Sequence, residues 1–242
     1  MKLGFLALAA GAMMSAAAAP AAPITFAQFQ QLGGDDTFRV TNGAGSTGTL
    51  STIGTPIVNF SFLRPAMQDA GFGSQDAYFS LSGTISTPAS VMTLPGPDPI
   101  NQLVTSGSLS FTRVTPADVG MNTRTNLLTI SFTDAILTGS LGGTSGSLLA
   151  STPDSVMTFT SDFLNFDNSF ALDFALALSS ITGGGLGRAN ASESLRAFTA
   201  DSTGTFSSDP APLTTVPEPA ALGLMGLGLA GIALRRRRRK AA

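Results

Sequence analysis

Large apolar residues alternate with small or polar residues along several segments of this chain. In 170–178, five large apolar residues are separated by single alanine or aspartate residues. A period of two places these five side chains on one face of a β-strand. The same alternation recurs in 58–62, 79–81, 109–111, 128–132 and 157–159.

Residues typical of turns separate these segments, for example Asn42–Gly43, the proline-rich 95–99, Gly142–Gly143 and 183–185. Strands with one apolar and one polar face usually form antiparallel sheets. We therefore predict an all-β fold, a single antiparallel β-sandwich of jelly-roll type. Sixteen of the 17 phenylalanines lie in this region and should form most of its core. Short helical turns are expected only at 65–68 and 116–119.

The first residues have the pattern of a signal peptide. Lys2 precedes an apolar run and then a stretch of small residues. The apolar run is too short for a membrane-spanning helix, and we predict a signal helix over 1–21. Cleavage is expected between Ala21 and Ala22, with cleavage after Ala18 as the alternative. The consequence is export through the inner membrane.

The rest of the chain divides into three parts by composition. Residues 22–201 form the predicted β-sandwich ectodomain. Residues 202–215 are rich in Ser, Thr and Pro, and we interpret them as a linker or stalk. Residues 216–242 form a tail with a composition of its own.

The charges of the chain are segregated, so the formal net charge of −2 is misleading. Six of the 13 basic residues lie in 235–240. The segment 22–217 holds six basic and 14 acidic residues, a net charge of −8. An acidic domain argues against nucleic acid or an anionic membrane as its partner.

The residue types that are missing exclude several kinds of catalysis. The chain has no Cys and no His, and its lysines are Lys2 and Lys240 alone. Cysteine–histidine pairs, Ser-His-Asp triads and serine–lysine dyads are therefore impossible. Paired carboxylates remain for a glycan hydrolase, with Asp162, Asp167 and Asp173 as candidates, but nothing in the sequence brings two of them together. We predict no catalytic residues and no enzymatic activity.

Calcium is the only metal that these residue types suit, because it needs oxygen ligands alone. Asp162, Asn165, Asp167 and Asn168 cluster in one segment, and 35–36 holds two more aspartates. Neither group matches an EF-hand or a calcium-binding repeat. We interpret them as turn and loop residues, and we assign no metal and no cofactor.

The tail has three features in a fixed order. Val216–Pro219 comes first, and an uncharged apolar stretch of 15 residues, 220–234, follows it. As a helix this stretch is about 22 Å long, against about 30 Å for a bilayer core, so it spans only with snorkelling or local thinning. The basic cluster after it should stop transfer and stay cytoplasmic. This cluster is Arg235, Arg236, Arg237, Arg238, Arg239 and Lys240.

This tail resembles a PEP-CTERM sorting signal. Pro217, Glu218 and Pro219 match the motif of that family, and the short transmembrane helix and the arginine cluster follow in the same order. The resemblance implies a Gram-negative bacterium and an exosortase, a membrane enzyme that processes the chain near the motif. It also implies an association with exopolysaccharide or biofilm. The resemblance covers the tail alone, and these three residues are recognition residues rather than catalytic ones.

The leader and the tail together predict an exported structural protein of the cell surface or extracellular matrix. The precursor is expected to be anchored in the inner membrane through 220–234 and to face the periplasm. After processing by the exosortase it would reach the cell surface or matrix, with exopolysaccharide as a possible partner.

Two other function classes remain open for the β-domain. A carbohydrate-binding or adhesive module would show clustered exposed aromatic residues or a bound calcium ion, and a smooth Ser/Thr surface would count against it. A glycan hydrolase would show a deep cleft with two carboxylates about 5–10 Å apart.

Overall fold

The computed structural model describes residues 23–119, 122–167, 169, 171–208 and 211–212. The predicted signal peptide and the tail 216–242 lie outside the described residues. The described residues form fourteen strands and one short helix. They are β1 (Ile24–Gln31), β2 (Phe38–Asn42), β3 (Gly48–Thr52), β4 (Ile57–Phe62), α1 (Pro65–Asp69), β5 (Gln75–Ile85), β6 (Ser90–Val91), β7 (Pro99–Val119), β8 (Asn122–Ser140), β9 (Gly146–Ser151), β10 (Met157–Thr160), β11 (Leu164–Asn165), β12 (Asp173–Ser179), β13 (Phe198–Ser208) and β14 (Ala211–Pro212).

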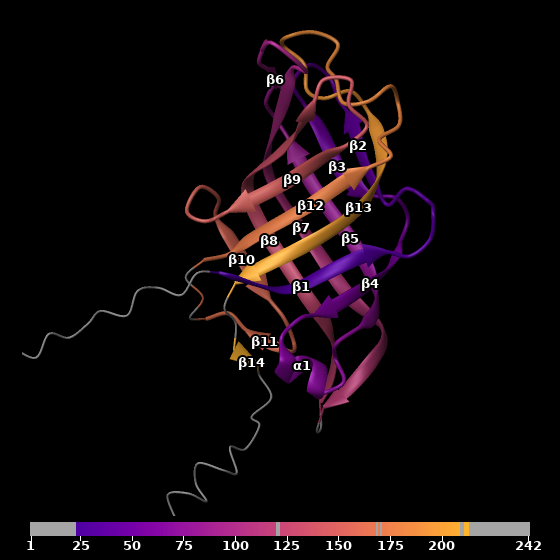
Figure 1. Ribbon diagram of the computed structural model, residues 1–242, viewed down its shortest axis with the longest axis vertical. Helices are drawn as coiled ribbons and strands as arrows, with labels where there is room; N and C mark the ends of the chain where they lie inside the picture. The colour runs from indigo at the N-terminus through magenta and orange to yellow at the C-terminus, as the bar shows by residue number, and fades with distance from the viewer. Residues whose placement is uncertain (1–22, 120–121, 168, 170, 209–210, 213–242) are drawn as a thin grey trace, which may run out of the picture.

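Twelve of these strands form one antiparallel sheet, and this sheet closes on itself. Hydrogen-bonded neighbours run from β1 through β4, β5, β7, β8, β9, β12 and β13, and β13 pairs again with β1. In Figure 1 the strands β9, β12, β13 and β1 cross in front of β5, β7 and β8 at a large angle. The apolar face of every strand in this circuit therefore points to one enclosed interior.

Two pairs of short strands complete the circuit between β5 and β13. Near one end, β4 pairs with residues 75–78 of β5, and β1 pairs with residues 204–208 of β13. Toward the other end, β3 pairs with residues 82–85, and β2 pairs with residues 198–200. The sheet is therefore continuous around both halves of its length.

The predicted all-β, antiparallel class is confirmed, but the strands are not divided into the two separate sheets of a sandwich. The sequence pattern could not distinguish these arrangements, because strands of a sandwich and of a closed sheet both alternate apolar-in and polar-out. The distinction depends on long-range pairing, such as that of β1 with β13. No local alternation specifies such a pair.

Phenylalanine fills the interior, as the sequence predicted. Thirteen phenylalanines are buried, and Phe72 and Phe166 are partly buried against them. Phe111 lies at the centre of this packing, with ring centroids of Phe29, Phe60 and Phe79 at 4.9, 5.0 and 5.1 Å. Rings at these separations gain dispersion and quadrupole attraction beyond the burial of their area.

A glycine in β7 allows the sheet to pack this closely. A Cβ atom on Gly107 would lie 2.5 Å from Cζ of Phe132 and 2.6 Å from the backbone oxygen of Ser82. Both distances are shorter than any real Cβ contact, and the second neighbour is backbone that cannot rotate away. Glycine is therefore required here by close approach.

The predicted linker is wrong for its first half. Residues 202–208 belong to β13, which pairs with β12 on one side and with β1 on the other. The residues of this segment alternate like those of the other strands, with Ser202, Phe206 and Ser208 buried. The composition of this segment is misleading because its inward residues are small. A Cβ atom on Gly204 would lie 2.5 Å from Cε1 of Phe29, whose ring occupies the space beside the strand. Residues 209–210 and 213–215 lie outside the described residues.

One of the two predicted helical turns is confirmed and the other is wrong. The segment 65–68 lies in α1, but 116–119 is part of β7. The β7–β8 register shifts between Thr112 and Ala117. Pro116 lies inside that irregularity, so its missing N–H costs no ladder hydrogen bond.

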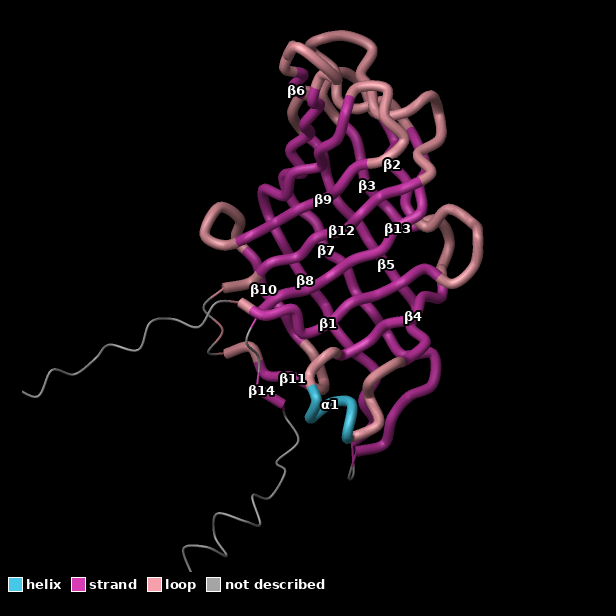
Figure 2. The backbone as a smooth tube through the Cα atoms, viewed as in Figure 1, coloured by secondary structure: helices cyan, strands magenta, loops and turns pink. Residues whose placement is uncertain are grey.

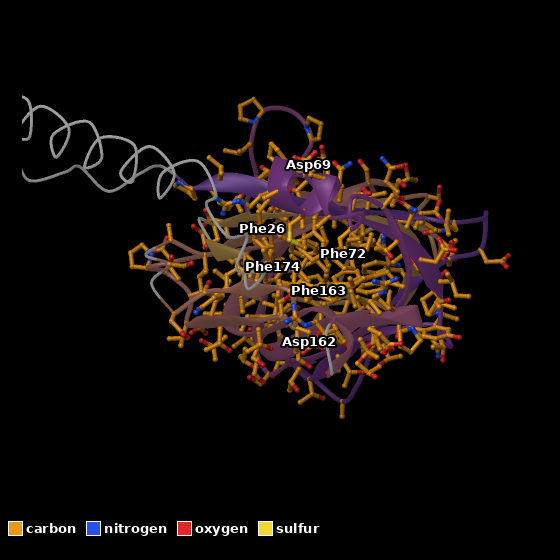
Figure 3. All side chains as sticks on the ribbon, turned by 90° about the horizontal axis from the view of Figure 1, so that it is seen from below. Phe26, Asp69, Phe72, Asp162, Phe163 and Phe174 are labelled. Carbon is orange, nitrogen blue, oxygen red and sulfur yellow. The ribbon has the colours of Figure 1, made fainter. Side chains whose placement is uncertain are left out.

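The two ends of the closed sheet differ. Figure 2 shows long loops gathered at the end that carries β6, whereas α1, β11 and β14 lie at the opposite end. The view onto the α1 end in Figure 3 shows Phe26, Phe72, Phe163 and Phe174 in the space between the strands. We call this end the α1 end.

Candidate functional site

The outer face of the sheet is lined by hydroxyl groups. One row crosses four strands through the paired residues Ser82, Ser108, Ser131 and Thr158. The hydroxyls of Ser82 and Ser108 lie 3.2 Å apart and form a hydrogen bond. Within the described part of the chain, the only aromatic side chain among the exposed large hydrophobic residues is Tyr78, which is 40% exposed.

A shallow groove of about 540 Å³ runs over the outer face of β8, β9, β12 and β13. Ile136 and Leu149 are directly paired across β8 and β9 and contribute apolar surface to the groove, with exposed fractions of 48% and 42%. Three carboxyl side chains also line it, those of Asp134, Asp154 and Asp173.

Hydrogen bonds and backbone geometry indicate structural roles for two of these aspartates. The hydroxyl of Ser151 donates to the carboxylate of Asp173. Asp134 has a left-handed backbone (φ 59°), which aspartate tolerates better than most residues, and its carbonyl oxygen accepts from Ser155 at 3.2 Å. Asp134 and Asp154 were not among the sequence candidates. The sequence signal for Asp134 was an acidic residue inside a segment that alternates between apolar and polar residues.

Two other candidates, Asp162 and Asn165, bind backbone N–H groups. The Oδ2 atom of Asp162 accepts hydrogen bonds from the backbone N–H groups of Thr125 and Asn126, at 2.9 and 2.8 Å. The side chain of Asn165 accepts from the N–H of Asp167 at 2.7 Å. Across the described ranges, no group of three or more acidic residues is arranged to hold a metal ion.

The second acidic segment is also occupied by hydrogen bonds. The carboxylate of Asp36 accepts from the hydroxyl of Thr199, and the backbone oxygen of Asp35 accepts from Nε2 of Gln31 at 2.6 Å. The first of these bonds joins the 33–37 turn to β13. Among the residues described, no metal-holding group joins these two aspartates to Asp162.

The predicted sorting residues Pro217, Glu218 and Pro219 lie outside the described residues. The described chain ends in β14, which pairs with β11 at the α1 end. Four residues separate Pro212 from Pro217, and even a fully extended chain of that length spans only about 18 Å.

The predicted membrane segment 220–234 and the basic cluster 235–240 also lie outside the described residues, as do Ala21 and Ala22. Among the residues that the structure describes, no helix is both long and apolar enough to cross a membrane.

Comparison with known proteins gives one match. The family model described as the PEP-CTERM protein-sorting motif matches residues 215–239. No curated protein and no solved structure matches the chain. The match includes Pro217, Glu218 and Pro219, the residues that the sequence analysis assigned to recognition. The chain therefore carries a PEP-CTERM protein-sorting motif, which implies an exported protein that is anchored at the membrane while an exosortase sorts it.

Proposed function

We propose that this chain is a structural protein of the cell surface or extracellular matrix, delivered there by an exosortase. The signal peptide 1–21 directs export and is removed. Residues 220–234 then hold the precursor in the inner membrane, with the β-domain in the periplasm and the basic cluster in the cytoplasm. Processing near Pro217–Pro219 releases the domain to the surface or the exopolysaccharide matrix.

The observation that carries this proposal is the combination of a sorting motif with a closed, hydroxyl-covered domain. A sheet without long free edges resists strand addition by other chains, which suits a protein kept at high concentration. Outward Ser and Thr, as in the row from Ser82 to Thr158, remain hydrated and compatible with polysaccharide. The domain is thus suited to persist in a matrix.

The short connection between the domain and the motif supports this orientation. With Pro212 and Pro217 separated by four residues, the domain's α1 end faces the membrane in the precursor. The loop-bearing end then faces away from the bilayer, and the exosortase meets the motif beside a folded domain.

The other function classes receive less support. A saccharide site usually stacks sugars on exposed aromatic rings, and the described residues offer Tyr78 alone. A hydrolase needs two free carboxylates across a cleft, and the groove over β12 is shallow, with Asp173 engaged by Ser151. We therefore propose a non-enzymatic role.

The proposal is tested by changing the motif in the full chain, in its native host. Replacing Pro217, Glu218 and Pro219 with alanine should leave the precursor in the inner-membrane fraction at full tail length. The wild-type chain should appear in the surface or matrix fraction without its tail. The measurement is the mass of the chain in each fraction.

A substitution next to the motif provides the control. Thr214→Ala leaves the recognition residues intact and should be processed like the wild type. If the alanine variant of the motif reached the matrix at the same mass and yield as the wild type, exosortase sorting through this motif would be wrong.

A further inference from the structure

The shallow groove over β8, β9, β12 and β13 presents two different rows of side chains to solvent. The first row is apolar, because Leu149 on β9 pairs with Ile136 on β8 and with Ala175 on β12. In Figure 1 β9, β12 and β13 lie side by side, so this row crosses the strands rather than following one of them. Ile136 and Leu149 are both exposed. The groove therefore has an apolar floor that is open to solvent.

The second row is polar and acidic. Asp173 on β12 pairs with Ser151 on β9 and with Ser207 on β13, and all three residues line the groove. This row lies two positions along each strand from the apolar row, and so on the same outer face. Asp134 lies two positions before the apolar row on β8, and Asp154 lies in the turn that follows β9. An acidic row thus runs beside the apolar one.

The protein itself does not balance the charge of the groove. Among the described residues, no lysine or arginine lines it. In the same part of the chain, the carboxylates of Asp134 and Asp154 have no hydrogen-bond or ion-pair partner, whereas that of Asp173 accepts from a hydroxyl. Three negative charges beside an apolar floor attract a cation and repel an anion. The groove is therefore complementary to a ligand that combines positive charge with apolar surface.

Uncharged polar groups offer a further kind of contact. Those that line the groove are Asn101, Thr138, Ser151, Ser155, Thr205 and Ser207. Some of them already donate within the protein, as Thr138 does to the side chain of Asn101 at 2.6 Å, but each hydroxyl oxygen can still accept. A ligand that carries hydroxyls beside its amines can use these groups fully, whereas an aliphatic amine has no hydroxyls to pair with them.

The shape of the groove favours a chain over a compact molecule. Its volume of about 540 Å³ lies in the range of small-molecule sites. It crosses four strands, however, which is roughly 14 Å at about 4.8 Å per strand. A shallow site of this length contacts only one side of its ligand. A polymer that makes several weak contacts in succession suits such a site better than one small molecule does.

We propose that this groove binds an amine-bearing polysaccharide, a chain of sugars whose amino groups are not acylated. The ammonium groups pair with the carboxylates of Asp134, Asp154 and Asp173, and the C–H faces of the sugar rings lie on Ile136 and Leu149. No exposed aromatic ring lines the groove among the described residues. Neutral saccharides therefore gain little from stacking here, and the ion pairs select the cationic ones.

This inference names a partner for the proposed matrix role, and it rests on that role only for the place where the domain and the polysaccharide meet. The binding itself is a property of the groove and is measured without sorting. A groove without affinity for amino sugars would leave the sorting proposal intact. A chain that is not sorted would leave the affinity of its groove unchanged.

The test uses the full chain in a neutral detergent at about pH 6, where carboxylates are ionised and amines are protonated. The probe is a tetrasaccharide of glucosamine. Its fully N-acetylated counterpart is the control without charge, and spermidine is the control with charge but without sugar. The midpoint of thermal unfolding against probe concentration gives an affinity, because a ligand that binds only the folded state stabilises it. Both controls should bind at least about fivefold more weakly than the probe.

Replacing Asp134, Asp154 and Asp173 together with asparagine should weaken binding of the probe by about tenfold. Asparagine tolerates the left-handed backbone at position 134 and can still accept from Ser151 at position 173. The variant without probe should therefore unfold near the wild-type temperature. Added sodium chloride should also weaken binding to the wild type, because exposed ion pairs are screened.

Replacing Asp35, Asp69 and Asp76 together with asparagine is the matched control. It removes the same number of negative charges from exposed positions outside the groove, and it should bind the probe like the wild type. The proposal is overturned if the glucosamine tetrasaccharide does not raise the midpoint, or if either control ligand binds as tightly. It is also overturned if the control variant loses as much affinity as the groove variant.

Discussion

The centre and the α1 end of the interior are both lined by phenylalanine, but the rings contact different groups in the two places. At the centre, the ring of Phe111 is surrounded by other rings and is fully buried. At the α1 end, the rings of Phe72 and Phe163 face the guanidinium groups of Arg113 and Arg124. The same residue type therefore supports a dry core in one place and holds cations in the other.

This difference indicates where the fold gains stability and where it gives some up. Each ring buried at the centre removes apolar area from water at no electrostatic cost. A half-buried cation without a partner loses hydration that no hydrogen bond replaces.

The largest effect should come from the centre. Phe111→Ala removes a ring that contacts those of Phe29, Phe60, Phe79 and Phe206. We expect a loss of about 3–5 kcal/mol in the free energy of unfolding, because the cavity cannot collapse in a closed sheet. Denaturant unfolding of the purified full chain measures it. A loss below about 1 kcal/mol would contradict the assignment of the core centre.

The second-largest destabilisation should come from disturbing the close packing within the sheet. Gly107→Ala places a Cβ against the ring of Phe132 and the backbone oxygen of Ser82. We expect destabilisation of about 1–3 kcal/mol from overpacking, although alanine normally favours a strand over glycine. The same denaturant titration tests it, with Gly34→Ala, where no atom lies within 4 Å, as the control.

The third effect should come from removing the carboxylate of Asp162 at the α1 end. Asp162→Ala leaves the N–H groups of Thr125 and Asn126 without their acceptor. We expect a loss of about 1–3 kcal/mol, the cost of unsatisfied donors. Hydrogen exchange should locate the change, with faster exchange at these two amides and little change at the centre. Uniformly faster exchange would argue against a local role.

The outer face should be nearly neutral. Ser110→Ala removes an outward hydroxyl on β7 opposite Thr129 of β8. We expect a change within about 0.5 kcal/mol, since surface substitutions away from special features are mild. A loss of unfolding free energy comparable to that of Asp162→Ala would show that the hydroxyl rows stabilise the fold as well as keep the surface hydrated.

The sequence allowed the strands and their buried faces to be predicted, because alternation is local. The inward positions Val58, Phe60 and Phe62 are buried as predicted. Within 170–178, Phe174, Leu176 and Leu178 are buried as expected, but the strand begins only at Asp173. Leu172 precedes the strand and is partly buried against the core.

Features that depend on long-range pairing could not be predicted. Closure requires β1 to pair with β13. The side chains of Thr25 on β1 and Ser207 on β13 form a hydrogen bond across this pair, although the two residues are 182 positions apart in the sequence. The contacts of Arg113 and Arg124 with the rings of Phe72 and Phe163 depend on the β7–β8 register, which shifts between Thr112 and Ala117. No residue spacing in the sequence indicates that Arg113 and Arg124 meet neighbouring rings. The tail differs, since its signal is linear and was found from sequence alone.

The most direct test of the account is the intact mass of the protein from its native host, with and without the exosortase. We predict that the mature chain begins near Ala22 and lacks everything beyond about Pro219, and that the strain without exosortase retains the tail. Any additional mass on the mature chain would identify the group to which the tail was exchanged. A chain that ends at Ala242 in both strains would show that the tail is a permanent anchor, and would contradict sorting through this motif.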